Sequence, residues 1–178
     1  YTFWFALSFS VKKHQVVVPK SLRTLTAVIG GVLFIQLVYG AFMAGLHAAV
    51  YAPTWPKING QWIPTNMNNL SPAWINILEN RIAIHFIHRG LAYILVVLVM
   101  VWWYKVSKIK TGSFFNKTKW MPSVLILLQA VLGIFTVLLS PFGNNLVYFG
   151  VAHQWVAMLF LMSLLLMWYL MIPKSKES

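Results

Sequence analysis

The sequence predicts an all-α membrane protein, built as a four-helix transmembrane bundle that follows a short N-terminal helix stub. Hydrophobic residues make up 60% of the 178-residue chain, and the mean hydropathy is +0.73. Charged residues make up only 9%, whereas soluble domains carry about 25%. Four apolar runs are long enough to cross a bilayer, and polar connections separate them.

The net charge of +12 comes from fourteen Lys and Arg residues against two acids, Glu79 and Glu177. Such an imbalance can indicate nucleic-acid binding. Here the basic residues lie in short connections between apolar runs, so they report membrane topology and no nucleic-acid partner is expected. The chain has no cysteine, which excludes disulfides, iron–sulfur clusters and thiolate ligands. Imidazole is therefore the expected metal donor.

The predicted elements begin with residues 1–11, an apolar stub shorter than the ~20 residues that a span requires. We interpret the stub as the end of a preceding transmembrane helix, so we expect the chain to be the C-terminal part of a longer protein. A basic connection, 12–24, follows as a cytoplasmic loop. The four-helix bundle occupies 25–172, and residues 173–178 form a cytoplasmic tail.

Four spans are predicted within the bundle. In order, they are Leu25–Tyr51, Arg81–Tyr104, Trp120–Ser140 and Leu146–Ile172. The first two are joined by a long loop, 52–80, whose Trp residues suit the membrane interface. The short connections with most Lys and Arg are predicted to be cytoplasmic, so this loop lies on the outer side. We expect the membrane to be a bacterial plasma membrane; a mitochondrial inner membrane is the alternative.

An internal repeat appears when the spans are compared in pairs. The first span contains Gln36 and Gly40 four residues apart, and the third contains Gln129 and Gly133 at the same spacing. The second and fourth spans each carry a histidine near the outer end. The predicted unit is a Gln/Gly helix, an outer connection and a His helix, used twice in parallel orientation.

The histidines of the two units lie at similar depth. His88 is ~10 Å along its helix from Arg81, and His153 is ~12 Å from Asn145, at 1.5 Å per residue. Both helices enter from the outer side, so the imidazoles can clamp one planar ligand from two faces, as histidines hold haem iron in a bundle. Arg89 can pair with a haem propionate at that edge.

Other interpretations of these residues remain open. A lone histidine in a membrane helix more often forms a hydrogen bond between helices than it ligates a metal. His85, three residues before His88, shares roughly the same face and is a rival ligand. Gln36 and Gln129 are expected to form hydrogen bonds across helices. No phosphate loop, hydrolase triad or carboxylate pair is present, so the residues assign no catalytic group.

Several motifs together resemble the C-terminal half of haem A synthase, the membrane enzyme family that makes haem A for cytochrome oxidase. The likeness extends from about Leu25 to Trp168. The motifs that carry it are Gly40-Ala-Phe-Met-Ala-Gly45-Leu-His, Gly60-Gln-Trp-Ile-Pro64, Glu79-Asn80, His85-Phe-Ile-His88-Arg89, Gln129-x-x-x-Gly133 and His153-Gln154.

The resemblance implies one half of an eight-helix protein whose two four-helix halves are related by a pseudo-twofold axis. It implies that His88 and His153 are the axial ligands of a haem b cofactor in this half. The missing N-terminal half would bind the substrate haem O, whose C8 methyl is oxidised to a formyl group by successive hydroxylations. A glutamate of that half is implicated in catalysis. Haem O synthase, cytochrome oxidase assembly factors and further copies of the chain are the expected partners, besides membrane lipid.

Two positions depart from the family pattern. His47 stands where mitochondrial relatives are expected to carry an acidic residue, and His85 replaces a common glutamine. Two other functions are also compatible with the sequence. One is a b-type electron-transfer subunit without biosynthetic activity, and the other is a scaffold or transporter repeat in which the histidines only form hydrogen bonds.

Overall fold

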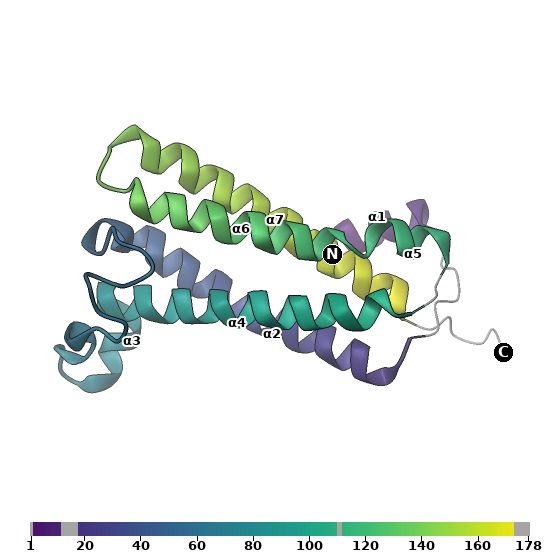
Figure 1. The fold of residues 1–178 in the computed structure, drawn as a ribbon, viewed down its shortest axis with the longest axis horizontal. Coiled ribbons are helices and arrows are strands. Elements are labelled where there is room, and N and C mark those ends of the chain that lie inside the picture. Colours follow the sequence, from purple (N-terminus) through teal and green to yellow (C-terminus); the bar gives the residue numbers. More distant parts are fainter. Residues whose placement is uncertain (1, 12–17, 110–111, 173–178) are drawn as a thin grey trace.

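The computed structural model describes residues 2–11, 18–109 and 112–172, and Figure 1 shows its fold. Parts of the predicted cytoplasmic loop (12–17) and the whole predicted tail (173–178) lie outside the described residues. The α-helices are α1 (Thr2–Ser10), α2 (Lys20–Gly45), α3 (Asn76–Glu79), α4 (Arg81–Ser107), α5 (Ser113–Thr118), α6 (Met121–Leu138) and α7 (Asn144–Met171). Three short 3-10 helices are η1 (Ala48–Tyr51), η2 (Thr65–Asn68) and η3 (Ala73–Ile75).

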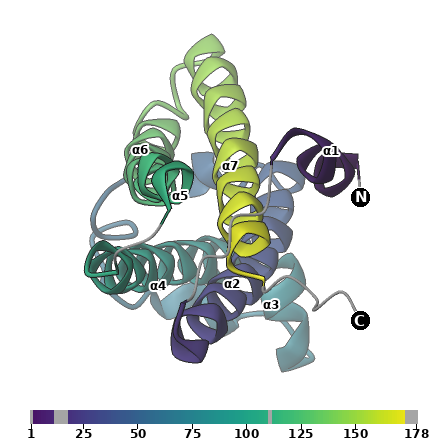
Figure 2. The same ribbon diagram turned by 90° about the vertical axis from the view of Figure 1, so that its right-hand side faces the viewer.

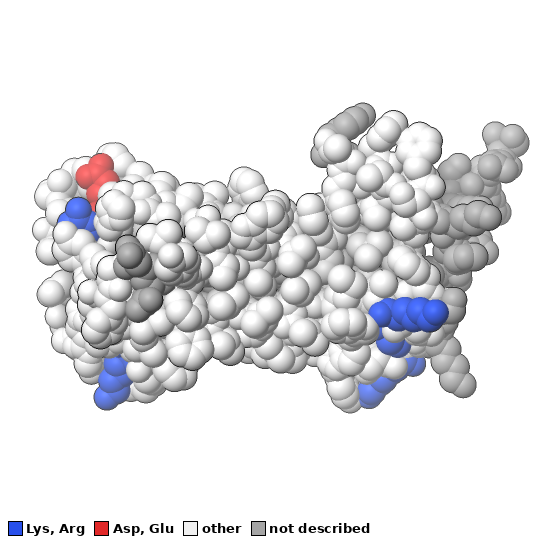
Figure 3. All heavy atoms as spheres, turned by 90° about the horizontal axis from the view of Figure 1, so that it is seen from above, with Lys and Arg blue, Asp and Glu red and all other residues white. Residues whose placement is uncertain are grey.

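Four described helices are long and apolar enough to cross a membrane, which confirms the predicted fold class. The 27 residues of α4 give a length of about 40 Å, more than the ~30 Å hydrocarbon core requires. On the face shown in Figure 3, the described Lys and Arg side chains lie at the two ends of the molecule, with a wide uncharged band between them. The chain is an integral membrane protein.

The four long helices pack in the cyclic order α2, α4, α6, α7, seen end-on in Figure 2. The closest pairs are α2 with α4 and α6 with α7, which are the two units of the predicted repeat. α4 also contacts α6, and α2 contacts α7. The pairs α2/α6 and α4/α7 therefore stand on the two diagonals of the bundle. The two histidine helices form one diagonal, and the two glutamine helices form the other.

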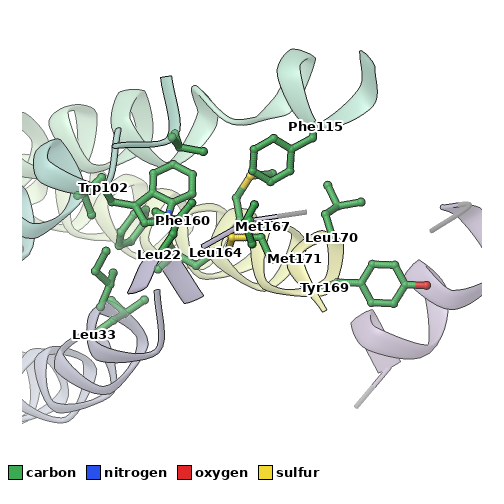
Figure 4. Close-up of a cluster of buried hydrophobic side chains, with 14 of the residues drawn as sticks. Leu22, Leu33, Trp102, Phe115, Phe160, Leu164, Met167, Tyr169, Leu170 and Met171 are labelled. Atoms are coloured by element: carbon green, nitrogen blue, oxygen red, sulfur yellow. The ribbon is translucent and has the colours of Figure 1, made fainter. Parts of the chain in front are cut away.

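The apolar core occupies one half of the bundle, on the side of α1 and α5. Trp102, Phe160 and Met167 are almost completely buried there, with side chains of all four long helices around them (Figure 4). α2 has no buried residue after Leu33. A second buried layer lies at the other end of the bundle, which is the predicted outer end. Here Ala48, Ala49, Ala52 and Ile58 of the connection 46–80 (called the outer loop) cover the bundle.

A hydrogen bond inside the core joins α4 to α2. The Trp102 indole Nε1 donates to Thr26 Oγ1 at 2.8 Å, and Thr26 Oγ1 donates to the Leu22 carbonyl at 2.9 Å. Both side chains are buried, so the indole N–H has no access to water. We expect Thr26→Val, which keeps the shape and removes the acceptor, to destabilise the protein by about 1 kcal/mol. Thermal unfolding in detergent measures this change, and an unchanged midpoint would show that the hydrogen bond contributes nothing.

The first long helix differs from its predicted limits at both ends. It begins at Lys20, directly after Pro19, so the helix starts within the connection predicted at 12–24. It ends at Gly45, because His47 adopts a left-handed backbone with φ of 50° and starts the short helix η1. Residues 46–51 therefore belong to the segment that covers this end of the bundle, called the outer cap, and not to the first span.

The outer loop is held by asparagines at the start of α4. Asn80 is the N-cap, and its Oδ1 accepts hydrogen bonds from the backbone N–H groups of Ile82 and Ala83 at 3.0 and 3.2 Å. Its Nδ2 donates to the Asn66 carbonyl at 2.9 Å. Asn is among the residues most favoured at this position, so the cap was detectable in the sequence. These contacts fix the loop against the end of the helix that carries the candidate site.

Candidate cofactor site

The two candidate ligands come from diagonally placed helices. His88 lies roughly 10 Å along α4 and His153 roughly 13 Å along α7, each measured from the outer end of its helix. The structure therefore places at one level, on diagonal helices, the pair that the sequence singles out.

Each imidazole is held by a glutamine from the neighbouring helix of its own unit. Gln36 Nε2 lies 3.3 Å from His88 Nε2, and Gln129 Nε2 lies 3.2 Å from His153 Nε2. The predicted hydrogen bonds of these glutamines across helices are confirmed. The Gln129 backbone carbonyl can only accept and lies 3.1 Å from His153 Nδ1, so the ring proton of His153 lies on Nδ1. In His153, Nε2 is therefore the nitrogen with the lone pair.

A glycine one turn beyond each glutamine lies against the same imidazole. A Cβ atom placed on Gly40 would be 3.4 Å from His88 Cε1, and one on Gly133 would be 3.0 Å from His153 Cε1. In both copies the Gln/Gly helix thus places a glutamine amide and a glycine against the imidazole of the His helix. The predicted repeat is present in side-chain contacts as well as in sequence.

The histidines lie between the two buried layers of the bundle. At their level no described residue of α7 from Leu146 to Leu159 is fully buried, and α2 has none between Phe34 and Gly45. The side-chain oxygens of Gln36 and Gln129 and the Nδ1 atom of His88 are buried without a hydrogen-bond partner. Unpaired buried polar atoms are rare in native proteins and call for an explanation. A layer short of apolar core but lined by imidazole and amide groups fits a planar cofactor that completes it.

No cluster of three or more His, Cys, Asp or Glu side chains is present among the described residues, so that part of the chain offers no conventional metal-ion site. Axial ligation of haem iron needs only two side chains, because the porphyrin supplies the other four nitrogens. The donor set of His88 and His153 is sufficient for that case.

Arg89 points toward the outer loop. Its Nε donates to His85 Nε2 at 3.0 Å, and one terminal nitrogen donates to the Thr54 carbonyl at 2.5 Å. Longer contacts of 3.3–3.4 Å reach the carbonyls of Ala52, Pro56 and Lys57. The guanidinium is buried, and these hydrogen bonds go to neutral acceptors. The sequence contained no signal for this clamp, because it depends on how the loop folds back.

The two histidines of the second span have separate surroundings. His85 is completely buried and accepts the hydrogen bond from Arg89, whereas His88 contacts Gln36 and the interior of the bundle. His85 therefore belongs to the outer cap. His47, the third histidine near this end, is exposed.

Comparison with known proteins identifies related chains. The family model described as "Cytochrome oxidase assembly protein" matches residues 1–165. Heme A synthase of Bartonella quintana (strain Toulouse) is 37% identical over 121 residues, which cover 67% of this chain and 34% of the relative. Heme A synthase of Bradyrhizobium sp. (strain ORS 278) is 37% identical over 145 residues, 79% of this chain and 40% of the relative.

A third relative extends the match along the chain. Heme A synthase of Rhodopseudomonas palustris (strain BisA53) is 35% identical over 164 residues, 90% of this chain and 44% of the relative. The chain thus spans between a third and a half of the length of these relatives. No solved structure matches the chain significantly. On the family match over residues 1–165 and these identities, the chain belongs to the haem A synthase family of cytochrome oxidase assembly proteins.

Proposed function

We propose that this chain is the cofactor-holding half of a haem A synthase, the oxidoreductase that converts the C8 methyl of haem O to a formyl group for cytochrome oxidase assembly. One observation carries the proposal most strongly. Two imidazoles from diagonal helices lie at one level between buried layers, and a glutamine amide of the same unit contacts Nε2 of each. His88 and His153 are the proposed axial ligands of haem b.

When bound, a b-type haem supplies reversible one-electron transfer. The chain's own residues bind and orient it. Gln36 and Gln129 hold the two imidazoles through Nε2, and they would give up these contacts if Nε2 held the haem iron. Arg89 is the proposed partner of a propionate. Its three contacts at 3.3–3.4 Å are the ones that a carboxylate would replace, since charged acceptors bind guanidinium more strongly than neutral carbonyls.

The substrate haem O is assigned to the portion of the relatives that this chain does not cover. That portion is more than half of each relative cited above. Haem O synthase and cytochrome oxidase assembly factors are the proposed partners, and a homo-oligomer is a further proposal. The bacterial plasma membrane is the proposed location, because the relatives cited are bacterial.

The experiment that tests this function measures haem products. The full-length gene, of which this chain is the proposed C-terminal half, is expressed in a bacterial host that accumulates haem O and makes no haem A, and the extracted haems are separated by chromatography. We expect haem A with the unaltered gene and none with His88→Ala or His153→Ala. Haem b in the purified protein without any haem A would instead identify a b-type electron-transfer subunit. Haem A formation that survives both substitutions would contradict the assignment of the two ligands.

The proposed topology places the basic connections in the cytoplasm and the long loop outside. Because the chain has no cysteine, single cysteines at Lys57 and Lys108 report the side directly. We expect a membrane-impermeant maleimide to label Lys57→Cys in intact cells and Lys108→Cys only after permeabilisation. Labelling in the opposite pattern would reverse the topology.

A further inference from the structure

The two repeat units hold their histidines differently, and the difference begins at the glycines. The Cβ of an alanine at position 133 would lie 3.0 Å from Cε1, 3.5 Å from Nδ1 and 3.8 Å from Nε2 of His153. An alanine at position 133 therefore requires the imidazole to shift by a few tenths of an ångström. At Gly40 the nearest atom of His88 is 3.4 Å from the added Cβ, an ordinary van der Waals contact.

The close approach at Gly133 lets His153 reach the backbone of α6. Its Nδ1 lies 3.1 Å from the Gln129 carbonyl oxygen, and with the proton on Nδ1 this contact is a hydrogen bond from the ring to the carbonyl. The Gln129 side chain contacts Nε2 of the same ring. One residue therefore fixes both nitrogens of His153, and its backbone bond persists if Nε2 leaves the amide.

The equivalent hydrogen bond is looser at His88. The Gln36 backbone carbonyl faces the ring as a hydrogen-bond acceptor, but the buried Nδ1 has no partner within hydrogen-bonding geometry. His88 is therefore fixed mainly through Nε2, and ligation would remove that contact. Hydrogen bonds from Nδ1 to a carbonyl orient a ligating histidine and raise its basicity, and their loss typically costs 10–100-fold in metal affinity.

We infer that Gly133 and the Gln129 carbonyl are the positioning elements of His153, and that they make His153 the stronger and less exchangeable of the two haem ligands. His88 is then the exchangeable ligand. The inference rests on the proposed haem ligation. Gly133 and Gln129 of α6 would thus fix His153 more firmly than Gly40 and Gln36 of α2 fix His88, although the two repeats look alike in sequence.

The test compares alanine substitutions at three glycines of the whole protein. Gly133→Ala places a methyl group against the His153 ring, and Gly40→Ala is the equivalent change in the other unit. Gly150→Ala is the matched control, because an added Cβ there meets nothing within 4 Å. The readout is the rate of haem transfer to excess apomyoglobin. We expect Gly133→Ala to raise the rate about 10-fold or more and Gly40→Ala to raise it much less. Gly150→Ala should leave it unchanged.

Equal effects at Gly133 and Gly40, or none at Gly133, would overturn the inference while leaving the two ligands in place. A wild-type protein without haem would instead reject the proposed function. If Gly133→Ala does not fold, nuclear magnetic resonance of the wild-type protein with ¹⁵N-labelled histidine decides the question. One strongly hydrogen-bonded Nδ1–H among the two ligands supports the asymmetry, and two equivalent Nδ1–H signals overturn it.

Discussion

Replacing either His88 or His153 by alanine is expected to abolish the six-coordinate low-spin haem spectrum of the purified protein. Each substitution removes one of two axial donors, and none of the described residues at this level is a third imidazole. Loss of even an outer-shell partner of a metal ligand costs about 10–100-fold in affinity, so loss of the ligand itself should cost at least as much. The measurement is haem content per protein together with the α-band absorbance of the reduced sample.

The control for this prediction is His47→Ala, which removes an exposed imidazole from the same end of the molecule. It should retain the wild-type spectrum and haem content. His85→Ala tests the rival ligand. Because His85 contacts Arg89 and lies in the outer cap, this variant should keep the low-spin spectrum. If His85→Ala loses the low-spin spectrum and His88→Ala keeps it, the assignment of His88 is wrong.

Replacing Arg89 by methionine is expected to release the outer loop. The side chain keeps its apolar length but loses the donors that reach His85 and four backbone carbonyls, all close to the bundle. Carbonyls left buried without donors cost about 1–3 kcal/mol each, reduced where water can enter. We expect a destabilisation of about 3 kcal/mol and faster proteolysis between residues 52 and 64. Unfolding in detergent and limited proteolysis measure the two effects.

Arg81→Met is the matched control at the start of the same helix. Arg81 donates to the Leu46 carbonyl and the Tyr51 hydroxyl, but it is exposed and water can replace these bonds. It should lose less than about 1 kcal/mol. Arg89→Lys should resemble Arg89→Met, since an ammonium cannot reproduce the planar fork. An Arg89→Met protein as stable as Arg81→Met would show that the clamp does not hold the loop.

The spans and the repeat were predictable because their signals are local. Uninterrupted hydrophobicity identifies a membrane helix wherever it occurs, and the Gln–Gly spacing of four residues places both on one helix face. The pairing of Gln36 with His88 and Gln129 with His153 then follows from antiparallel neighbours joined by the outer connections. These predictions need no knowledge of how distant segments fold.

The orientation of Arg89 and the division between His85 and His88 were not predictable in this way. His85 and His88 differ by three residues, so periodicity gives them nearly the same face, and only the folded loop shows that one meets the cap and the other the interior. Arg89 binds residues more than thirty positions earlier in the chain. The end of α2 at Gly45 likewise depends on the left-handed turn at His47, which hydropathy does not reveal.

The most direct test of this account is near-infrared magnetic circular dichroism of the oxidised, purified protein, because the charge-transfer band identifies the axial ligands of low-spin ferric haem. Bis-imidazole coordination by His88 and His153 predicts a single low-spin signal of that type, absent from both alanine variants. A high-spin or five-coordinate haem, a different ligand pair, or a protein that binds no haem would contradict it.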